Sequence, residues 1–176
     1  MMSNNLKISV KNWLLFGIAT VMLLFLSSVT LYAQEKPPRP VKIFVSPSQG
    51  LIFGAFSQTG SGGTVILSPT GSRSSTGNII LLNLGFTFSP AILEVDGEPG
   101  TLVTIVNGPD ATLTGSGGGS ITLHLGGANP ASPFVATATS PSRTQIRVGG
   151  TLTVGSALAS PPGNYNGTFN ITFVQQ

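Results

Sequence analysis

One histidine, His124, and no cysteine are available for chemistry in this chain of 176 residues. His124 lies in an alternating run in which it shares one strand face with Ser120 and Thr122, opposite three apolar residues. On a half-buried strand, such a polar face points to solvent. A nucleophile needs a base within reach and a group that orients that base, and a transition-metal site usually combines several His, Cys or carboxylate ligands. The sequence therefore predicts no catalytic residue, no cofactor and no metal ligand, and hence not an enzyme.

Three acidic residues, Glu94, Asp96 and Glu98, lie two positions apart and could face the same way. Carboxylate oxygens suit a hard cation, so a calcium site is one interpretation. The ligand spacing of a known calcium loop is absent, however, and residues 96–100 (Asp-Gly-Glu-Pro-Gly) also have the composition of a hairpin connection. We therefore expect residues 96–100 to form a hairpin connection and not a calcium site.

A second polar face is formed by Arg143, Gln145 and Arg147, which alternate with Thr144, Ile146 and Val148. Its two positive charges could hold a carboxylate or an acidic sugar. A solvated face, or a sheet edge guarded against pairing, is the simpler interpretation.

The N-terminus predicts an export signal. Lys7 and Lys11 precede an apolar run from Trp13 to Val29, and a small residue, Ala33, follows. A basic head, an apolar run and a small residue at the cleavage site are typical of a secretory signal peptide. We expect a signal-peptide helix over residues 1–33 and cleavage after Ala33, so that membrane contact is limited to this segment before cleavage; the alternative is an uncleaved anchor.

The charge balance speaks against a nucleic-acid partner. The whole chain has a net charge of +3, but removal of Lys7 and Lys11 leaves six basic against five acidic side chains. Nucleic-acid binding needs clustered Lys and Arg, and the only basic residues close together are Lys36, Arg39 and Lys42, just after the signal. They lie among three prolines, and residues 34–40 are typical of a stiff, extended lead-in.

Residues 41–176 are expected to form one all-β domain. Short β-rich runs alternate with Gly, Pro, Ser and Asn, which predicts an antiparallel β-sandwich or barrel. The expected strands are residues 41–45, 51–56, 64–68, 79–84, 92–96, 102–106, 111–114, 120–125, 134–139, 144–148, 151–154 and 168–174. The glycine-rich segments 59–63 and 115–119 are expected to be the most flexible loops.

The last expected strand should close the core. Phe169, Ile171 and Phe173 occupy every second position, so they share one face and are expected to be buried. Just before this strand, Tyr165 is expected to bond a nearby backbone group through its hydroxyl, as in a tyrosine corner.

Several motifs resemble the DUF4402 family of exported bacterial proteins. They are Leu51-Ile52-Phe53-Gly54, the run from Gly62 to Arg73, Gly97-Glu98-Pro99-Gly100, the run from Gly149 to Gly155, and the run from Gly163 to Phe169. The resemblance covers nearly all of the chain from Val41 to Gln176. It implies an immunoglobulin-like or pilin-like β-sandwich, secreted or held at the cell surface or in the periplasm of a Gram-negative bacterium. The function of this family is unknown, so the resemblance supplies no site residues.

Two functions are expected to compete. The first is a structural subunit of the cell exterior, which pairs with itself or another surface protein by strand addition. The apolar alternation of Val41, Ile43 and Val45 predicts a strand that either joins its own sheet or adds to the edge of a neighbour. The second is a non-catalytic module that binds a surface glycan, although the only tryptophan lies in the signal and Tyr165 is the one tyrosine after it.

Overall fold

The chain is all-β. The computed structural model describes residues 42–45, 49–138 and 141–176, and all elements of regular secondary structure in these ranges are strands. The strands are β1 (Lys42–Val45), β2 (Phe56–Leu67), β3 (Arg73–Leu81), β4 (Ala91–Asp96), β5 (Leu102–Asn107), β6 (Ala111–Gly115), β7 (Ser120–Asn129), β8 (Phe134–Val135), β9 (Thr144–Val154), β10 (Tyr165–Asn166) and β11 (Ile171–Gln175). The expected signal peptide (1–33) and lead-in (34–40) lie outside the described residues. Within the described ranges, no helix suited to crossing a membrane is found.

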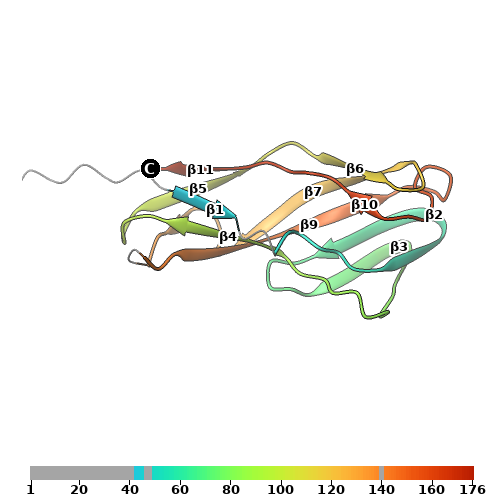
Figure 1. Cartoon of the computed structure of the whole chain (residues 1–176), viewed down its shortest axis with the longest axis horizontal. Coiled ribbons are helices and arrows are strands. Elements are labelled where there is room, and N and C mark those ends of the chain that lie inside the picture. Colours follow the sequence, from blue (N-terminus) through green and yellow to red (C-terminus); the bar gives the residue numbers. More distant parts are fainter. Residues whose placement is uncertain (1–41, 46–48, 139–140) are drawn as a thin grey trace, which may run out of the picture. The chain divides into compact units, whose positions relative to one another are not determined.

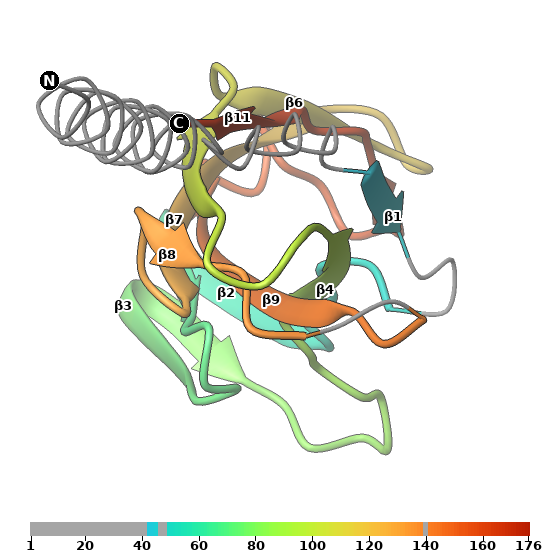
Figure 2. The same ribbon diagram turned by 90° about the vertical axis from the view of Figure 1, so that its left-hand side faces the viewer.

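Two antiparallel sheets contain these strands (Figures 1 and 2). The larger sheet runs in the order β1-β4-β9-β7-β6-β10, with β2 also paired to β9 and β3 paired to β2. The smaller sheet has the order β11-β5-β8. The all-β, antiparallel fold expected from the sequence is therefore confirmed.

Strand β9 is the axis of the larger sheet. One of its edges pairs with β7, while the other pairs with β4 in its first half and with β2 in its second half. The sequence predicted two strands here, 144–148 and 151–154, and that division is wrong because β9 runs through Gly149 and Gly150. A Cβ on Gly149 would lie 2.3 Å from the carbonyl oxygen of Leu67. These glycines thus permit close approach of β2 and do not end the strand.

The core lies between the two sheets. Its most deeply buried side chains are Leu67, Ile121, Ile146, Val65, Val95, Val103 and Val148. The alternation of Phe169, Ile171 and Phe173 toward this core is as predicted, but all three are only partly buried. Strand β11 pairs with β5 alone, so one side of the strand lacks the neighbour that would cover them. The expectation of full burial is corrected to partial burial.

The glycine-rich segment 59–63 is not the flexible loop that we predicted. It lies inside β2, at a register shift between Gln58 and Gly63. Gly62 has a φ of +93°, and a Cβ there would lie 2.2 Å from the carbonyl oxygen of Val154. The positive φ and the close approach both require glycine at position 62, so β2 is kinked here against the end of β9.

Three further expectations about element bounds were inaccurate. Residues 51–55 contribute only one bridge, from Ile52 to Ser89, because β2 begins at Phe56. Strand β3 begins at Arg73, six residues before the expected strand 79–84. Strand β8 covers only two residues of the expected strand 134–139. The segment 115–119 forms a tight turn, in which Gly118 N–H donates to the carbonyl of Gly115 over 3.0 Å.

Strand β1 pairs within its own chain. Its four residues align antiparallel with β4, from Lys42 opposite Asp96 to Val45 opposite Leu93. Because β4 uses its other edge for β9, β1 is the outermost strand on this side of the sheet.

Candidate functional site

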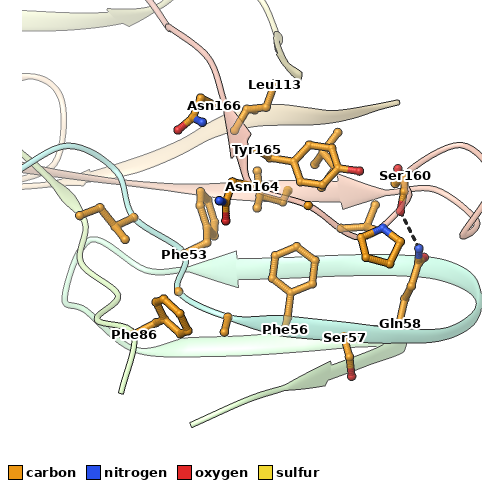
Figure 3. A pocket seen from close by; sticks show the side chains of 18 of the residues that line it. Phe53, Phe56, Ser57, Gln58, Phe86, Leu113, Ser160, Asn164, Tyr165 and Asn166 are labelled. Carbon is orange, nitrogen blue, oxygen red and sulfur yellow. Dashed lines mark hydrogen bonds between the residues drawn. The ribbon is translucent and has the colours of Figure 1, made fainter. Parts of the chain in front are cut away.

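An uncharged groove with a volume of about 800 Å³ opens between two segments that the sequence keeps far apart. Residues 51–58 form the first bank and residues 160–166 form the second. Leu113, Ile121, Leu152 and Val154 supply the floor. Figure 3 shows Phe53 and Phe56 on the first bank, facing Tyr165 and Leu113 across the opening. The volume is within the range of pockets that hold small ligands or short segments of chain.

Arg73 fixes the first bank. Its Nη1 donates to the carbonyl oxygens of Phe53 over 2.7 Å and Ala55 over 3.2 Å, and its Nη2 donates to the carbonyl of Leu82 over 3.1 Å. The guanidinium also lies 4.5 Å from the ring centroid of Phe88. A planar group with five N–H donors can join several carbonyls at once, so Arg73 ties residues 53–55 to the connection after β3.

A turn delivers Arg73 to this place. After β2, Gly71 N–H donates to the Ser68 carbonyl over 3.0 Å, and Gly71 has a φ of +90° that favours glycine. The hydroxyl of Ser68 also accepts from the N–H of Ser72 over 3.0 Å. These bonds explain the spacing of the Ser-Pro-Thr-Gly-Ser-Arg sequence that ends at Arg73.

The second bank is held by hydroxyl groups. The Tyr165 hydroxyl donates to the Pro161 carbonyl over 2.5 Å, which confirms the predicted bond to nearby backbone. The hydroxyl of Ser160, one of two polar side chains in the buried set, donates to the Ser120 carbonyl over 2.7 Å and accepts from Gly155 N–H over 3.1 Å. Residues 160–165 are thereby fixed to the ends of β7 and β9.

Gln58 connects the two banks and leaves one atom unpaired. Its Nε2 donates to the carbonyl of Ser160 over 2.8 Å, as Figure 3 shows. Its Oε1 is buried and is the only such side-chain atom among the described residues without a hydrogen-bond partner. A buried acceptor without a donor carries a free-energy cost of about 1–3 kcal/mol.

The structure places His124 outside the groove, on the exposed face predicted for it. Its Nδ1 lies 2.7 Å from Asp110 Oδ1, and both side chains are more than half exposed. The register that sets Ala111 opposite Leu123 brings the two groups together. The sequence alone did not indicate this pair, because the strand register was not known.

The charged faces singled out in the sequence also lie outside the groove. Arg143 Nη1 is 2.9 Å from Glu94 Oε2, and Arg147 Nε donates to Gln145 Oε1 over 3.3 Å. Within the part of the chain that the structure describes, no three His, Cys, Asp or Glu side chains gather as metal ligands. The arginine face therefore meets the acidic face through the Arg143–Glu94 ion pair.

Sequence reasoning found one groove residue, Tyr165, and missed the rest. The sequence predicts a strand over residues 51–56, and no local pattern singles out the polar Gln58. The available signal was the adjacency of aromatic and apolar residues around Gly54 without strict alternation, which departs from the pattern of a half-buried strand. That signal does not indicate which segment lies opposite.

A family match covers most of the chain. The family model described as "Domain of unknown function (DUF4402)" matches residues 43–174, in agreement with the resemblance of the motifs between Val41 and Gln176. Comparisons with curated proteins and with solved structures found no match. The match groups the chain by sequence and assigns no activity, ligand or partner.

Proposed function

We propose that this chain, which belongs to the DUF4402 family, is a non-catalytic structural protein that is exported from a Gram-negative bacterium and associates with copies of itself at the cell surface. One observation carries the proposal. The outer face of the smaller sheet exposes four large aliphatic side chains, those of Leu102, Val106, Val135 and Val174, each 40–48% exposed.

These four side chains lie on paired strands. The register sets Leu102 opposite Val135 and Val106 opposite Thr172. Val174 is two residues after Thr172 on β11, so its side chain is on the same face. They therefore form one uncharged surface, here called the β5 face. Contiguous apolar surface of this kind marks protein contacts in soluble proteins. Loss of that surface from water favours association by roughly 25 cal/mol for each Å² of apolar area.

We infer that the two sheets pack as an immunoglobulin-like or pilin-like sandwich. The shared core of the two antiparallel sheets supports this arrangement, and so does the hydroxyl bond of Tyr165 near the start of the last strands. Sandwiches of this type are common in proteins that act outside the cell.

The export step has its own test. If the segment that contains Lys7, Lys11 and the apolar run is a signal peptide, mass spectrometry of the exported protein will find Gln34, intact or cyclised, as the first residue. Intact Met1 in the exported pool would contradict cleavage.

Self-association is tested by sedimentation velocity of the mature protein. We expect the sedimentation coefficient to rise with protein concentration, and Val106→Lys to reduce the rise because it places a charge in the β5 contact. The matched control is Thr122→Lys on β7, another exposed strand residue that faces away from the core. Electron microscopy of cells with and without the gene then asks whether surface material is lost. A monomer at every concentration together with unchanged surface material would overturn the proposal.

The groove favours a second candidate, a glycan-binding module. It contains the rings of Phe53, Phe56, Phe86 and Tyr165 beside the amides of Gln58, Asn164 and Asn166, and such a mixture can bind sugars by ring contact and hydrogen bonds. A glycan array separates the candidates. Binding that is lost in Tyr165→Ala would favour the module.

A further inference from the structure

We propose that the groove accepts an added β-strand, and that this strand is the segment Val41–Val45 of a second copy of this chain. The inference deepens the proposed self-association and rests on it for the identity of the partner. The claim that the groove can accept a strand rests on the geometry of the groove alone.

The first bank offers unused backbone groups. Leu82 N–H donates to the carbonyl of Ala55 over 3.0 Å, and Phe56 aligns with Leu81. In an antiparallel ladder this bond makes Phe56 and Leu81 a pair without mutual hydrogen bonds. The N–H and C=O of Phe56, and by alternation those of Gln58, then point away from β3 and toward the groove.

The second bank offers the same arrangement. Ser116 N–H donates to the carbonyl of Asn164 over 2.9 Å, and Tyr165 aligns with Gly115. The N–H and C=O of Tyr165 therefore point away from β6, on the outer side of β10. In the part of the chain that the structure describes, no backbone hydrogen bond crosses the groove between residues 51–58 and 160–166.

The two banks run in the same direction. Four successive antiparallel pairings, β2–β9, β9–β7, β7–β6 and β6–β10, separate them. Because an even number of reversals restores the direction, β2 and β10 are parallel to each other. One strand that runs the opposite way can pair antiparallel with both, which is the more stable ladder on each side.

The lining sets the side chains of such a strand. All residues that line the groove are uncharged, and the floor of Leu113, Ile121, Leu152 and Val154 is apolar. Residues at alternate positions of an added strand would face this floor and must be apolar.

The chain carries a segment with these properties. Val41, Ile43 and Val45 are apolar at alternate positions, and the segment's one charge, on Lys42, is in the opposite set. Residues 42–45 already form a strand, β1, which is the outermost on its side and pairs with one neighbour. In the groove the same residues would have a neighbour on each edge, β2 and β10. The gain in main-chain hydrogen bonds favours transfer between copies.

The geometry of such a contact is open-ended. β1 and β10 lie at opposite ends of the strand order of the larger sheet, so the donating and accepting sites are different surfaces. A heterologous contact of this kind adds copies in series and closes only if the rotation between copies allows a ring.

The test uses the mature protein and a synthetic peptide with the sequence of residues 34–46. Amide exchange and chemical shifts are followed by NMR at single residues. We expect the peptide to slow exchange at the amides of Phe56, Gln58 and Tyr165, which face the groove. The amides of Ser57 and Asn166 alternate with them and pair with β3 and β6, so they should be unchanged and serve as internal controls. A peptide with Ile43→Asp should bind about tenfold more weakly or worse, because it places a charge on the apolar floor.

Each outcome decides between the alternatives. Protection of Phe56, Gln58 and Tyr165 by the peptide supports the proposal. No protection, or protection of Ser57 to the same extent, overturns strand addition. Oligosaccharides that shift these amides while the peptide does not would assign the groove to a glycan and overturn it as well. Sedimentation detects a failure of self-association separately, because the protein then stays monomeric. If the protein still associates through the β5 face but the peptide does not bind the groove, strand addition alone is overturned.

Discussion

Strands β9 and β11 are built from the same alternation of apolar and polar residues, yet they reach different depths. Ile146 and Val148 of β9 have no exposed surface, whereas Ile171 and Phe173 of β11 stay partly exposed. β9 has neighbours on both edges, and β11 has one, β5. The alternation therefore selects which side of a strand faces inward, and the number of neighbours determines how completely that side is buried.

The largest expected effect compares one chemical change at both strands. Ile146→Ala should lower the free energy of unfolding by about 3–5 kcal/mol, in the upper part of the range for buried aliphatic truncations. Ile171→Ala should cost about 1–2 kcal/mol, because part of the removed surface already contacts water. Urea unfolding of both variants measures the two values.

Two further variants on β11 test which side of the strand faces the core. Ile171→Asp places a charge against the core and should cost several kcal/mol, whereas Thr172→Asp lies on the exposed face and should melt within a few degrees of the parent. Equal losses in the two alanine variants, or equal melting of the two aspartate variants, would contradict the comparison.

The second prediction sharpens the contact between β2 and β9. Gly62→Ala should lower the free energy of unfolding by about 2–3 kcal/mol, because its Cβ would lie 2.2 Å from the carbonyl oxygen of Val154 and its φ is +93°. The control is Gly127→Ala on β7, where nothing lies within 4 Å of the added atom. We expect Gly127→Ala to change stability by less than about 0.5 kcal/mol. Equal values for the two variants would show that Gly62 is not packed.

Glycine shows how far the fold could be predicted from this sequence. The alternating runs that became β4, β5 and β6 were predicted within one residue, since their periodicity is local information. The sequence predicts a loop over residues 59–63 and a break at Gly149-Gly150. In both places glycine is present because another strand approaches closely, and that cause is not visible until the partner strand is known.

The candidate site was harder to predict for the same reason. Tyr165 was recognised because its bond to Pro161 spans four residues. Arg73 reaches 20 residues back to Phe53, and Gln58 reaches 102 residues forward to Ser160. The groove is thus formed by non-local contacts between two segments that have no common pattern.

The third prediction concerns the first bank of the groove, which Arg73 holds in place. Arg73→Lys should lower the free energy of unfolding by about 1–3 kcal/mol, because an ammonium group cannot reproduce the forked donation to three carbonyls. The local effect should exceed the global one. Exchange of the amides of Ile52 and Ser89, which bond each other's carbonyls, should accelerate more than exchange in β9. Uniform acceleration would mean that Arg73 supports the whole fold rather than this bank.

The smallest expected effect concerns His124 and Asp110, the pair on the outer face of the larger sheet. Their side chains are 69% and 55% exposed, so water screens the attraction and competes for the 2.7 Å hydrogen bond. Exposed pairs of this kind contribute about 0.2–1 kcal/mol. At about pH 5, where histidine side chains ordinarily carry a charge, a double-mutant cycle of His124→Ala and Asp110→Ala should give a coupling energy in this range, which decreases at high salt. Ile146 and His124 belong to strands of the same sheet, but Ile146 faces the core and His124 faces solvent. A coupling above about 2 kcal/mol, or one insensitive to salt, would show that the pair is shielded from water, as it would be if the outer face of β7 were covered by another copy of the chain.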